Sequence, residues 1–184
     1  MAAPLHYTAD MVRHLNDLHE WRWPRYEVVD GELLVTPAPR RWHQEIVRRL
    51  LVALSNYLDQ EPVAHVFTSP ADITWGAERL VQPDVFVVPK EHARTREWRE
   101  MDQLLLVIEV LSMSTARGDR LVKRRLYQRH GVPLYWLIDA DAKLAEVWTP
   151  TARKARIARD VLVWQPEGAS QPFVMSLDEL FLPI

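Results

Sequence analysis

Apolar residues recur along the chain with two periods, and these periods predict alternating helices and strands. Over residues 40–58 they are spaced three and four apart, which marks one face of a long helix. Similar spacing predicts an N-terminal helix capped by Thr8 and a helix over residues 117–130 that ends at Gly131. A last short helix is expected over residues 176–180.

Short apolar runs between these helices predict strands. Residues 26–35 are expected to form a hairpin, because Asp30-Gly31 suits a two-residue turn with positive φ at both central positions. Further strands are expected at 63–68, 71–75, 81–88, 104–110, 134–138 and 144–148, with one or two more within 153–164. This order predicts an α/β (α+β) fold, a mixed β-sheet flanked by helices, with an N-terminal helix and hairpin.

The composition is that of a folded globular protein. The chain has 184 residues, of which 48% are hydrophobic and 26% are charged. A single domain over residues 1–184 is expected, with an N-terminal helical segment at 1–24 and a C-terminal extension at 150–184 packed on the core.

Several classes of function are excluded or disfavoured. The chain has no cysteine, which excludes disulfides, thiolate metal sites and a cysteine nucleophile. It shows no signal peptide and no apolar stretch near the ~20 residues that span a bilayer, so a cytoplasmic protein without membrane contact is expected. The formal net charge of -2 means that binding to nucleic acid needs a local basic patch.

Glu109 is a carboxylate inside an otherwise apolar strand. Alternation places it on one face with Val107, while Ile108 and Val110 point to the other face. Both faces look buried, and an unpaired buried carboxylate is costly, so a cation or a strong donor must meet it. A structural ion pair adds little net stability, which favours a functional site by a modest margin.

Asp84 is the second acidic candidate. It follows Pro83 at the start of an apolar run, where an isolated aspartate is typical of a strand end. Together with Glu109 on a neighbouring strand, it predicts two carboxylates at one sheet edge, a donor set that suits Mg²⁺ or Mn²⁺. Glu32 is by default an exposed hairpin residue, but it adds a third metal-binding carboxylate if the hairpin lies over that edge.

Lys123 is the third candidate, with Asp119 and Tyr127 four residues to either side. At the edge of the buried helix face, its ammonium would either stabilise charge on a metal-bound phosphate or pair with Asp119. Spacing alone favours the pair. His43 lies on the apolar face of its helix, where a histidine is more often a core residue than a ligand.

Basic residues are frequent on the helix over residues 117–130. Arg117, Arg120 and Arg124 are candidates for contacts with nucleic-acid phosphates. The alternative is a solvated helix face, although the excess of one sign exceeds what solubility needs.

The combined pattern resembles the PD-(D/E)XK nuclease superfamily and, more closely, its Uma-type family of restriction-endonuclease-like proteins. The likeness spans about residues 7–148 and depends on the order and spacing of several motifs. These are Tyr26-Glu27-Val28-Val29-Asp30-Gly31-Glu32, Pro37-Ala38-Pro39-Arg40-Arg41-Trp42-His43, Pro83-Asp84-Val85, Ile108-Glu109-Val110-Leu111-Ser112 with Ser114-Thr115, then Asp119, Lys123, Tyr127, and Gly131-Val132-Pro133-Leu134-Tyr135-Trp136.

The resemblance implies a restriction-endonuclease-like core in which Asp84 and Glu109 hold Mg (or Mn). The motif lysine falls at Leu111, so the resemblance implies that Lys123 supplies it from the next helix. His43, Tyr127 and Ser112 belong to the matching motifs and are expected as accessory residues. The implied activity is metal-dependent endonuclease hydrolysis of DNA, and a double-strand cutter favours a homodimer.

Two other functions stay open at this point. One is a non-catalytic nucleic-acid-binding module on the same fold. The other is a structural domain in which Glu109 and Lys123 form a buried ion pair.

Overall fold

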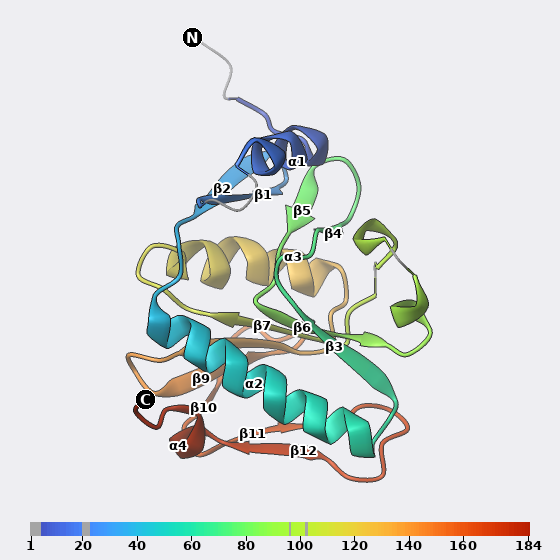
Figure 1. Cartoon of the computed structure of the whole chain (residues 1–184), viewed down its shortest axis with the longest axis vertical. Helices are drawn as coiled ribbons and strands as arrows, with labels where there is room; N and C mark the ends of the chain where they lie inside the picture. Colours follow the sequence, from blue (N-terminus) through green and yellow to red (C-terminus); the bar gives the residue numbers. More distant parts are fainter. Residues whose placement is uncertain (1–4, 20–22, 96, 102) are drawn as a thin grey trace.

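The computed structural model describes residues 5–19, 23–95, 97–101 and 103–184 (Figure 1). Its centre is a six-stranded mixed sheet of order β10-β9-β8-β7-β6-β3. The strands are β3 (Ala64–Thr68), β6 (Val85–Pro89), β7 (Leu106–Val110), β8 (Tyr135–Asp139), β9 (Leu144–Trp148) and β10 (Arg156–Ala158). Only the β7–β8 pair is parallel in this sheet, and the crossover between its strands carries the third helix.

Two smaller sheets flank the central one. The first has order β2-β1-β5-β4 and the second is the hairpin β11–β12. Their strands are β1 (Arg25–Val29), β2 (Glu32–Thr36), β4 (Ile73–Thr74), β5 (Arg79–Val81), β11 (Val161–Trp164) and β12 (Phe173–Ser176). The sequence did not predict β12, which pairs with β11 through register Val163↔Val174.

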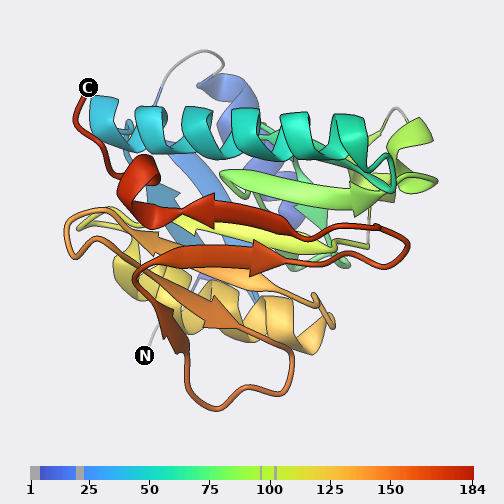
Figure 2. The ribbon, with the colours of Figure 1, turned by 90° about the horizontal axis from the view of Figure 1, so that it is seen from below.

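The described residues form four α-helices, which are α1 (Ala9–Leu18), α2 (Arg41–Gln60), α3 (Arg124–Arg129) and α4 (Leu177–Leu180). Helix α1 packs on the small sheet of β1, while α2 and α3 lie on opposite sides of the central sheet. Two 3₁₀ turns, His92–Arg94 and Trp98–Glu100, lie in the connection after β6. Figures 1 and 2 show α2 on one face of the central sheet and α3 on the other, between that sheet and the small sheet of β1.

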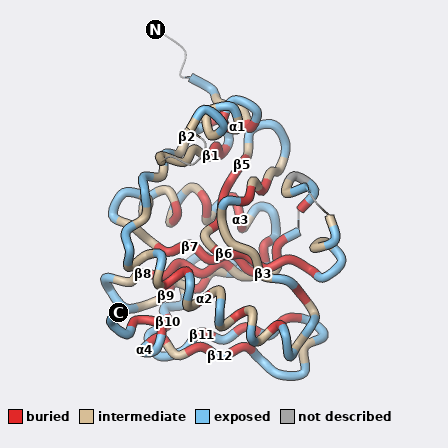
Figure 3. The backbone as a smooth tube through the Cα atoms, in the orientation of Figure 1, coloured by how far each residue is buried: buried red, intermediate tan, exposed pale blue. Residues whose placement is uncertain are grey.

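The two faces of the central sheet follow from strand alternation. Val85, Ile108 and Trp136 face the core shared with α2 and the β11–β12 hairpin. Phe86 and Val107 face the core shared with α3 and the small sheet. The middle strands of the sheet appear as continuously buried backbone in Figure 3. Glu109 therefore points toward α3, on the same face as Val107.

The local predictions are confirmed where short-range chemistry dominates. Asp30 and Gly31 adopt φ of 51° and 81°, as the predicted hairpin turn requires. Helix α2 buries Ile46, Leu50 and Leu54 on the predicted face. Within the N-terminal helical segment expected at residues 1–24, α1 ends at Leu18, and residues 1–4 and 20–22 lie outside the described residues.

Two predicted elements differ from the observed ones. The single strand expected over residues 81–88 is two strands, because the chain leaves the small sheet after Val81 and enters the central sheet at Val85. Pro83 lies in this crossing, where its missing N–H breaks no ladder. The helix expected over residues 117–130 begins with a π-helical turn, Gly118–Lys123. Among the described residues, no helix is long and apolar enough to cross a bilayer.

Candidate active site

Asp84 and Glu109 meet at one end of the central sheet. Strands β6 and β7 are antiparallel with register Val85↔Ile108, so one further step places Asp84 opposite Glu109. Residues directly opposite each other on antiparallel strands point to the same face. The convergence predicted from sequence therefore follows from the register of two neighbouring strands.

Lys123 lies among three buried carboxylates. Its Nζ is 2.8 Å from Glu27 Oε2, 3.0 Å from Glu109 Oε1 and 3.4 Å from Asp119 Oδ1. All four side chains are at most 6% exposed. The buried Tyr127 hydroxyl also donates to Glu109 Oε1, at 3.2 Å. We call Glu27, Glu109, Asp119 and Lys123 the lysine cluster.

The π-helical turn brings two members of this cluster inward. Arg124 N–H donates to the carbonyl of Asp119, five residues back, as in a π-turn. Asp119 and Lys123 lie four residues apart on this turn, and both are buried. Such single π-turns are frequent at functional sites.

The cluster carries more negative than positive charge. Burial raises the pKa of Glu109 well above its usual value; Lys123 opposes this rise, whereas Asp119 and Asp84 add to it. Burial lowers the pKa of Lys123, but Glu109, Glu27 and Asp119 outweigh that effect and raise it well above its usual value. A single ammonium therefore faces three buried carboxylates and does not balance their charge.

Asp84 is fixed by two donors. Its Oδ2 accepts the Val110 N–H at 2.9 Å and lies 3.2 Å from His43 Nε2. Burial raises the pKa of Asp84, but the hydrogen bond and charge of His43 outweigh it, so the pKa lies below its usual value. Burial lowers the pKa of His43, and the hydrogen bond and charge of Asp84 reverse this to a net rise. His43 thus contacts one of the acidic candidates and lines the cavity with it.

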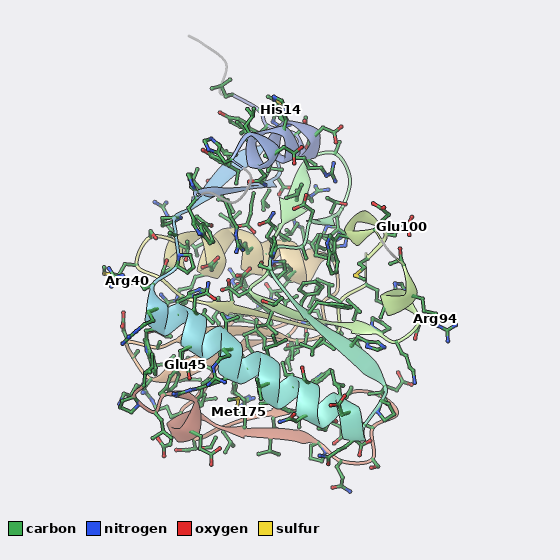
Figure 4. All side chains as sticks on the ribbon, viewed as in Figure 1. His14, Arg40, Glu45, Arg94, Glu100 and Met175 are labelled. Atoms are coloured by element: carbon green, nitrogen blue, oxygen red, sulfur yellow. The ribbon has the colours of Figure 1, made fainter. Side chains whose placement is uncertain are left out.

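These groups line one cavity of about 330 Å³. Its acidic and basic lining includes Glu27, Asp84, Glu109, Asp119, Lys123 and Arg25. His43 and Ser112 also line it, and Ser112 Oγ lies 3.0 Å from the Thr115 hydroxyl. Figure 4 labels Arg40, another lining residue, at the N-terminal end of α2. Apart from Glu32 and the arginine candidates, the residues predicted from sequence thus gather in or directly beneath this cavity.

Glu32 does not reach the cavity. It is exposed on β2 and borders a separate surface pocket with Asp30 and Arg129. The register explains this, since Glu32 pairs with Val29 at the turn end of the hairpin, whereas Glu27 pairs with Leu34 farther along. The hairpin therefore contributes Glu27, and the expectation of Glu32 as third carboxylate is corrected.

The three arginines predicted to contact phosphate do not line the cavity. Arg120 pairs with Asp139 at 2.8 Å and with Glu146 at 2.6 Å. Arg124 donates to the Arg120 carbonyl and stacks over the Trp148 ring at 4.6 Å. Arg117 is exposed. Two of the three arginines therefore have structural partners.

Glu27 and Arg25 are cavity residues that sequence reasoning did not select. A signal for Glu27 was present, because it alternates with Val29 in an apolar strand much as Glu109 alternates with Val107. The Gln82 N–H donates to Glu27 Oε1 at 2.7 Å, which fixes this carboxylate against the crossing that carries Asp84.

The acidic groups fit a divalent metal ion whose other ligands are water and phosphate oxygens rather than protein side chains. In the described part of the chain, no three carboxylate or imidazole groups converge closely enough to hold a metal ion alone. Mg²⁺ typically takes one or two carboxylates and completes its shell with water and phosphate. Among the described residues, hydrogen bonds to Asp84 and Glu109 end on Oδ2 and Oε1 alone, so each carboxylate keeps a second oxygen.

Comparisons with known proteins agree with this picture of the fold. The model of the Uma2 family, described as "Putative restriction endonuclease", matches residues 13–178. A crystal structure from Anabaena variabilis, described as "a putative nuclease belonging to DUF820", aligns with a TM-score of 0.70 and 24% identity. The alignment covers 86% of this chain and 90% of that one, which shows a shared fold. No curated protein matches the chain.

Proposed function

Because the chain belongs to the Uma2 family, we propose that it is a nuclease that uses Mg²⁺ or Mn²⁺ to hydrolyse phosphodiester bonds in DNA. The observation that carries the proposal is the convergence of Asp84 and Glu109 beside Lys123 in one cavity. Two carboxylates and one ammonium at the end of neighbouring strands suit a metal-bound phosphate.

Asp84 and Glu109 would hold the metal, and the backbone carbonyl of Val110, which also lines the cavity, is a further candidate ligand. When bound, the metal would act as a Lewis acid on the phosphodiester and as a template for the attacking water. This donor set leaves coordination positions for water and a phosphate oxygen. The lysine cluster holds more carboxylates than ammonium groups, and this excess of negative charge favours the binding of an added cation.

The neighbouring side chains have distinct roles in this proposal. The Lys123 ammonium, 3.0 Å from Glu109, stabilises the negative charge that develops on the phosphate or orients the attacking water. Tyr127 holds Oε1 of Glu109 through its hydroxyl. His43 contacts Oδ2 of Asp84 and so holds this carboxylate in the orientation that binds the metal.

A structural ion pair is the competing interpretation, and the observed Glu109–Lys123 contact favours it directly. One ammonium needs one carboxylate, however, and here three lie within 3.4 Å of Nζ. Additional buried carboxylates cost stability unless another cation meets them. The surplus of acid therefore supports a metal site over a purely structural pair.

Titration with Mn²⁺ tests the proposal. We expect calorimetry to show binding at one site and thermal unfolding to shift upward with Mn²⁺ concentration. Glu109→Gln and Asp84→Asn should abolish both effects and should abolish Mn²⁺-dependent nicking of supercoiled DNA. Glu32→Gln is the matched control, because it removes an acid from the same hairpin outside the cavity, and it should behave as wild type.

Two outcomes would contradict the nuclease proposal. Saturating Mn²⁺ that produces neither heat nor a thermal shift would remove the metal site. Glu109→Gln that loses stability but leaves metal binding and nicking unchanged would assign Glu109 to the ion pair alone. An RNA strand assayed in parallel distinguishes the two nucleic acids as substrates.

A further inference from the structure

Among the residues that the structure describes, Arg25 has no anionic partner, although it lies at an acidic cavity. It lies on β1, two residues before Glu27, and lines the cavity. In the described part of the chain its guanidinium makes no ion pair within 4.0 Å and no hydrogen bond, and its closest recorded partner is the Trp23 ring, 4.2 Å from Cζ. Buried or half-buried charges are normally paired or bind a ligand, so the absence of a partner needs an explanation.

Arg40, the other arginine of the cavity lining, is exposed to solvent, and two arginines outside that lining have carboxylate partners. Arg120 has two carboxylate partners. Arg49, in the middle of α2, is paired with Glu45. Arg25 is instead half-buried, and burial lowers its pKa while Asp84, Glu27 and Glu109 raise it. These three carboxylates thus attract Arg25 across the cavity without contacting it.

The guanidinium of Arg25 lies over the Trp23 ring, with Cζ 4.2 Å from the ring centroid. This contact is not a hydrogen bond, so the N–H donors stay available for a planar, two-point contact. A guanidinium fork matches the oxygens of a phosphate in this geometry. Trp23 also lines the cavity, which places the stacked pair at the candidate site.

We propose that Arg25, held against Trp23, anchors the phosphodiester of the substrate by donating to its non-bridging oxygens. This inference rests on the proposed function and adds the residue that binds the phosphate. A phosphate between Arg25 and the two metal-binding carboxylates would contact the guanidinium on one side and the cation on the other. The role expected of Arg120 and Arg124 on the outer helix face is thereby assigned to a residue within the cavity.

Binding of a labelled single-stranded DNA of roughly 12 nucleotides tests this anchor. The measurement is made on the full chain in Ca²⁺, another cation that takes oxygen ligands. We expect Arg25→Ala to weaken binding about 10- to 100-fold, the range of a charge-assisted contact. The affinity of Arg25→Lys should lie between those of wild type and Arg25→Ala, because lysine keeps the positive charge but lacks the two-point guanidinium geometry. Trp23→Ala should weaken binding and Trp23→Phe should retain most of it.

The salt dependence gives a readout that a structural role would not change. Losing one phosphate contact should reduce the slope of log affinity against log salt by about 0.7 for a single strand. Arg153→Ala is the control, since Arg153 is exposed and lies outside the cavity lining. Arg25→Ala should bind Mn²⁺ at least as tightly as wild type and should unfold at no lower temperature. These two results would separate the anchor from the metal site and from folding.

The outcomes separate this inference from the nuclease proposal. If Arg25→Ala binds DNA within twofold of wild type with an unchanged salt slope, the anchor is overturned even when Glu109→Gln abolishes nicking. If Arg25→Ala loses affinity and slope while wild type shows no nicking with Mn²⁺, the anchor stands and the nuclease proposal fails. Equal losses for Arg25→Ala and Arg153→Ala would also overturn the anchor.

Discussion

Lys123 and Arg120 lie three residues apart on the same π-helical turn, and each contacts more than one carboxylate. Lys123 lies inward, is 6% exposed and contacts three carboxylates. Arg120 lies outward, is 37% exposed and contacts Asp139 and Glu146. The chemical ingredients are similar, but the surroundings differ.

The difference shows how burial makes a group of ion pairs a candidate cation-binding site. At Arg120, water and salt screen the extra carboxylate, so the local excess of charge costs little. At Lys123, three carboxylates share one ammonium in a low-dielectric interior. Burial, together with Asp119, Asp84 and Glu27, raises the pKa of Glu109 there. Only the inward cluster therefore needs a proton or a further cation.

The largest expected effect comes from removing the buried cation. Lys123→Met keeps the approximate length of the side chain and leaves three carboxylates without their ammonium. We expect a loss of about 3–5 kcal/mol in the free energy of unfolding of the metal-free protein, measured by urea denaturation. Adding Glu109→Gln should recover part of this loss, because it removes one of the stranded charges. A loss no larger than that of Arg120→Met would refute the contrast.

The second effect concerns the cation that the buried cluster is expected to attract. His43→Ala removes the donor beside Oδ2 of Asp84, and we expect Mn²⁺ affinity to fall about 10- to 100-fold in calorimetry. His65→Ala, an exposed residue on β3, is the control and should leave the affinity unchanged. Unchanged affinity in His43→Ala would show that Val110 alone positions Asp84.

The smallest effect is expected at the outer cluster. Arg120→Met should cost about 1 kcal/mol or less, because exposed pairs gain little and are screened. This loss should shrink as NaCl rises from about 0.05 to 0.5 M, in line with the shorter screening length. Denaturation at both salt concentrations measures it, and a salt-independent loss above 3 kcal/mol would make Arg120 equivalent to a buried pair.

Elements whose form depends on neighbouring residues were predictable. The Asp30-Gly31 turn, the apolar face of α2 and the alternation around Glu109 each follow from backbone preference and side-chain period. Asp84 was predictable as a partner because it begins the strand next to Glu109. Lys123 could be selected only with the help of the family resemblance, since its spacing fits a surface pair equally well.

Glu27 and Glu32 show where such reasoning ends. Both are acids of one hairpin, and the alternation of Glu27 with Val29 indicates only that its strand face is buried, not which cavity it lines. The docking of that hairpin decides, because the Gln82 N–H, 55 positions away in sequence, binds Glu27. Arg120 and Arg25 show the same dependence on tertiary contacts. The carboxylates that pair with Arg120 come from β8 and β9, whereas no described carboxylate lies within ion-pair distance of Arg25.

The sequence by itself therefore determined the elements, the acidic strand positions and the family likeness, because these depend on residue type and short spacing. The tertiary structure alone decided three features: which acids share the cavity, the π-helical turn Gly118–Lys123 before α3, and the position of Arg25 at the acidic cavity. The physical reason is that burial and long-range contacts set the local dielectric and the charge balance. Neither quantity is encoded in the neighbours of a residue along the chain.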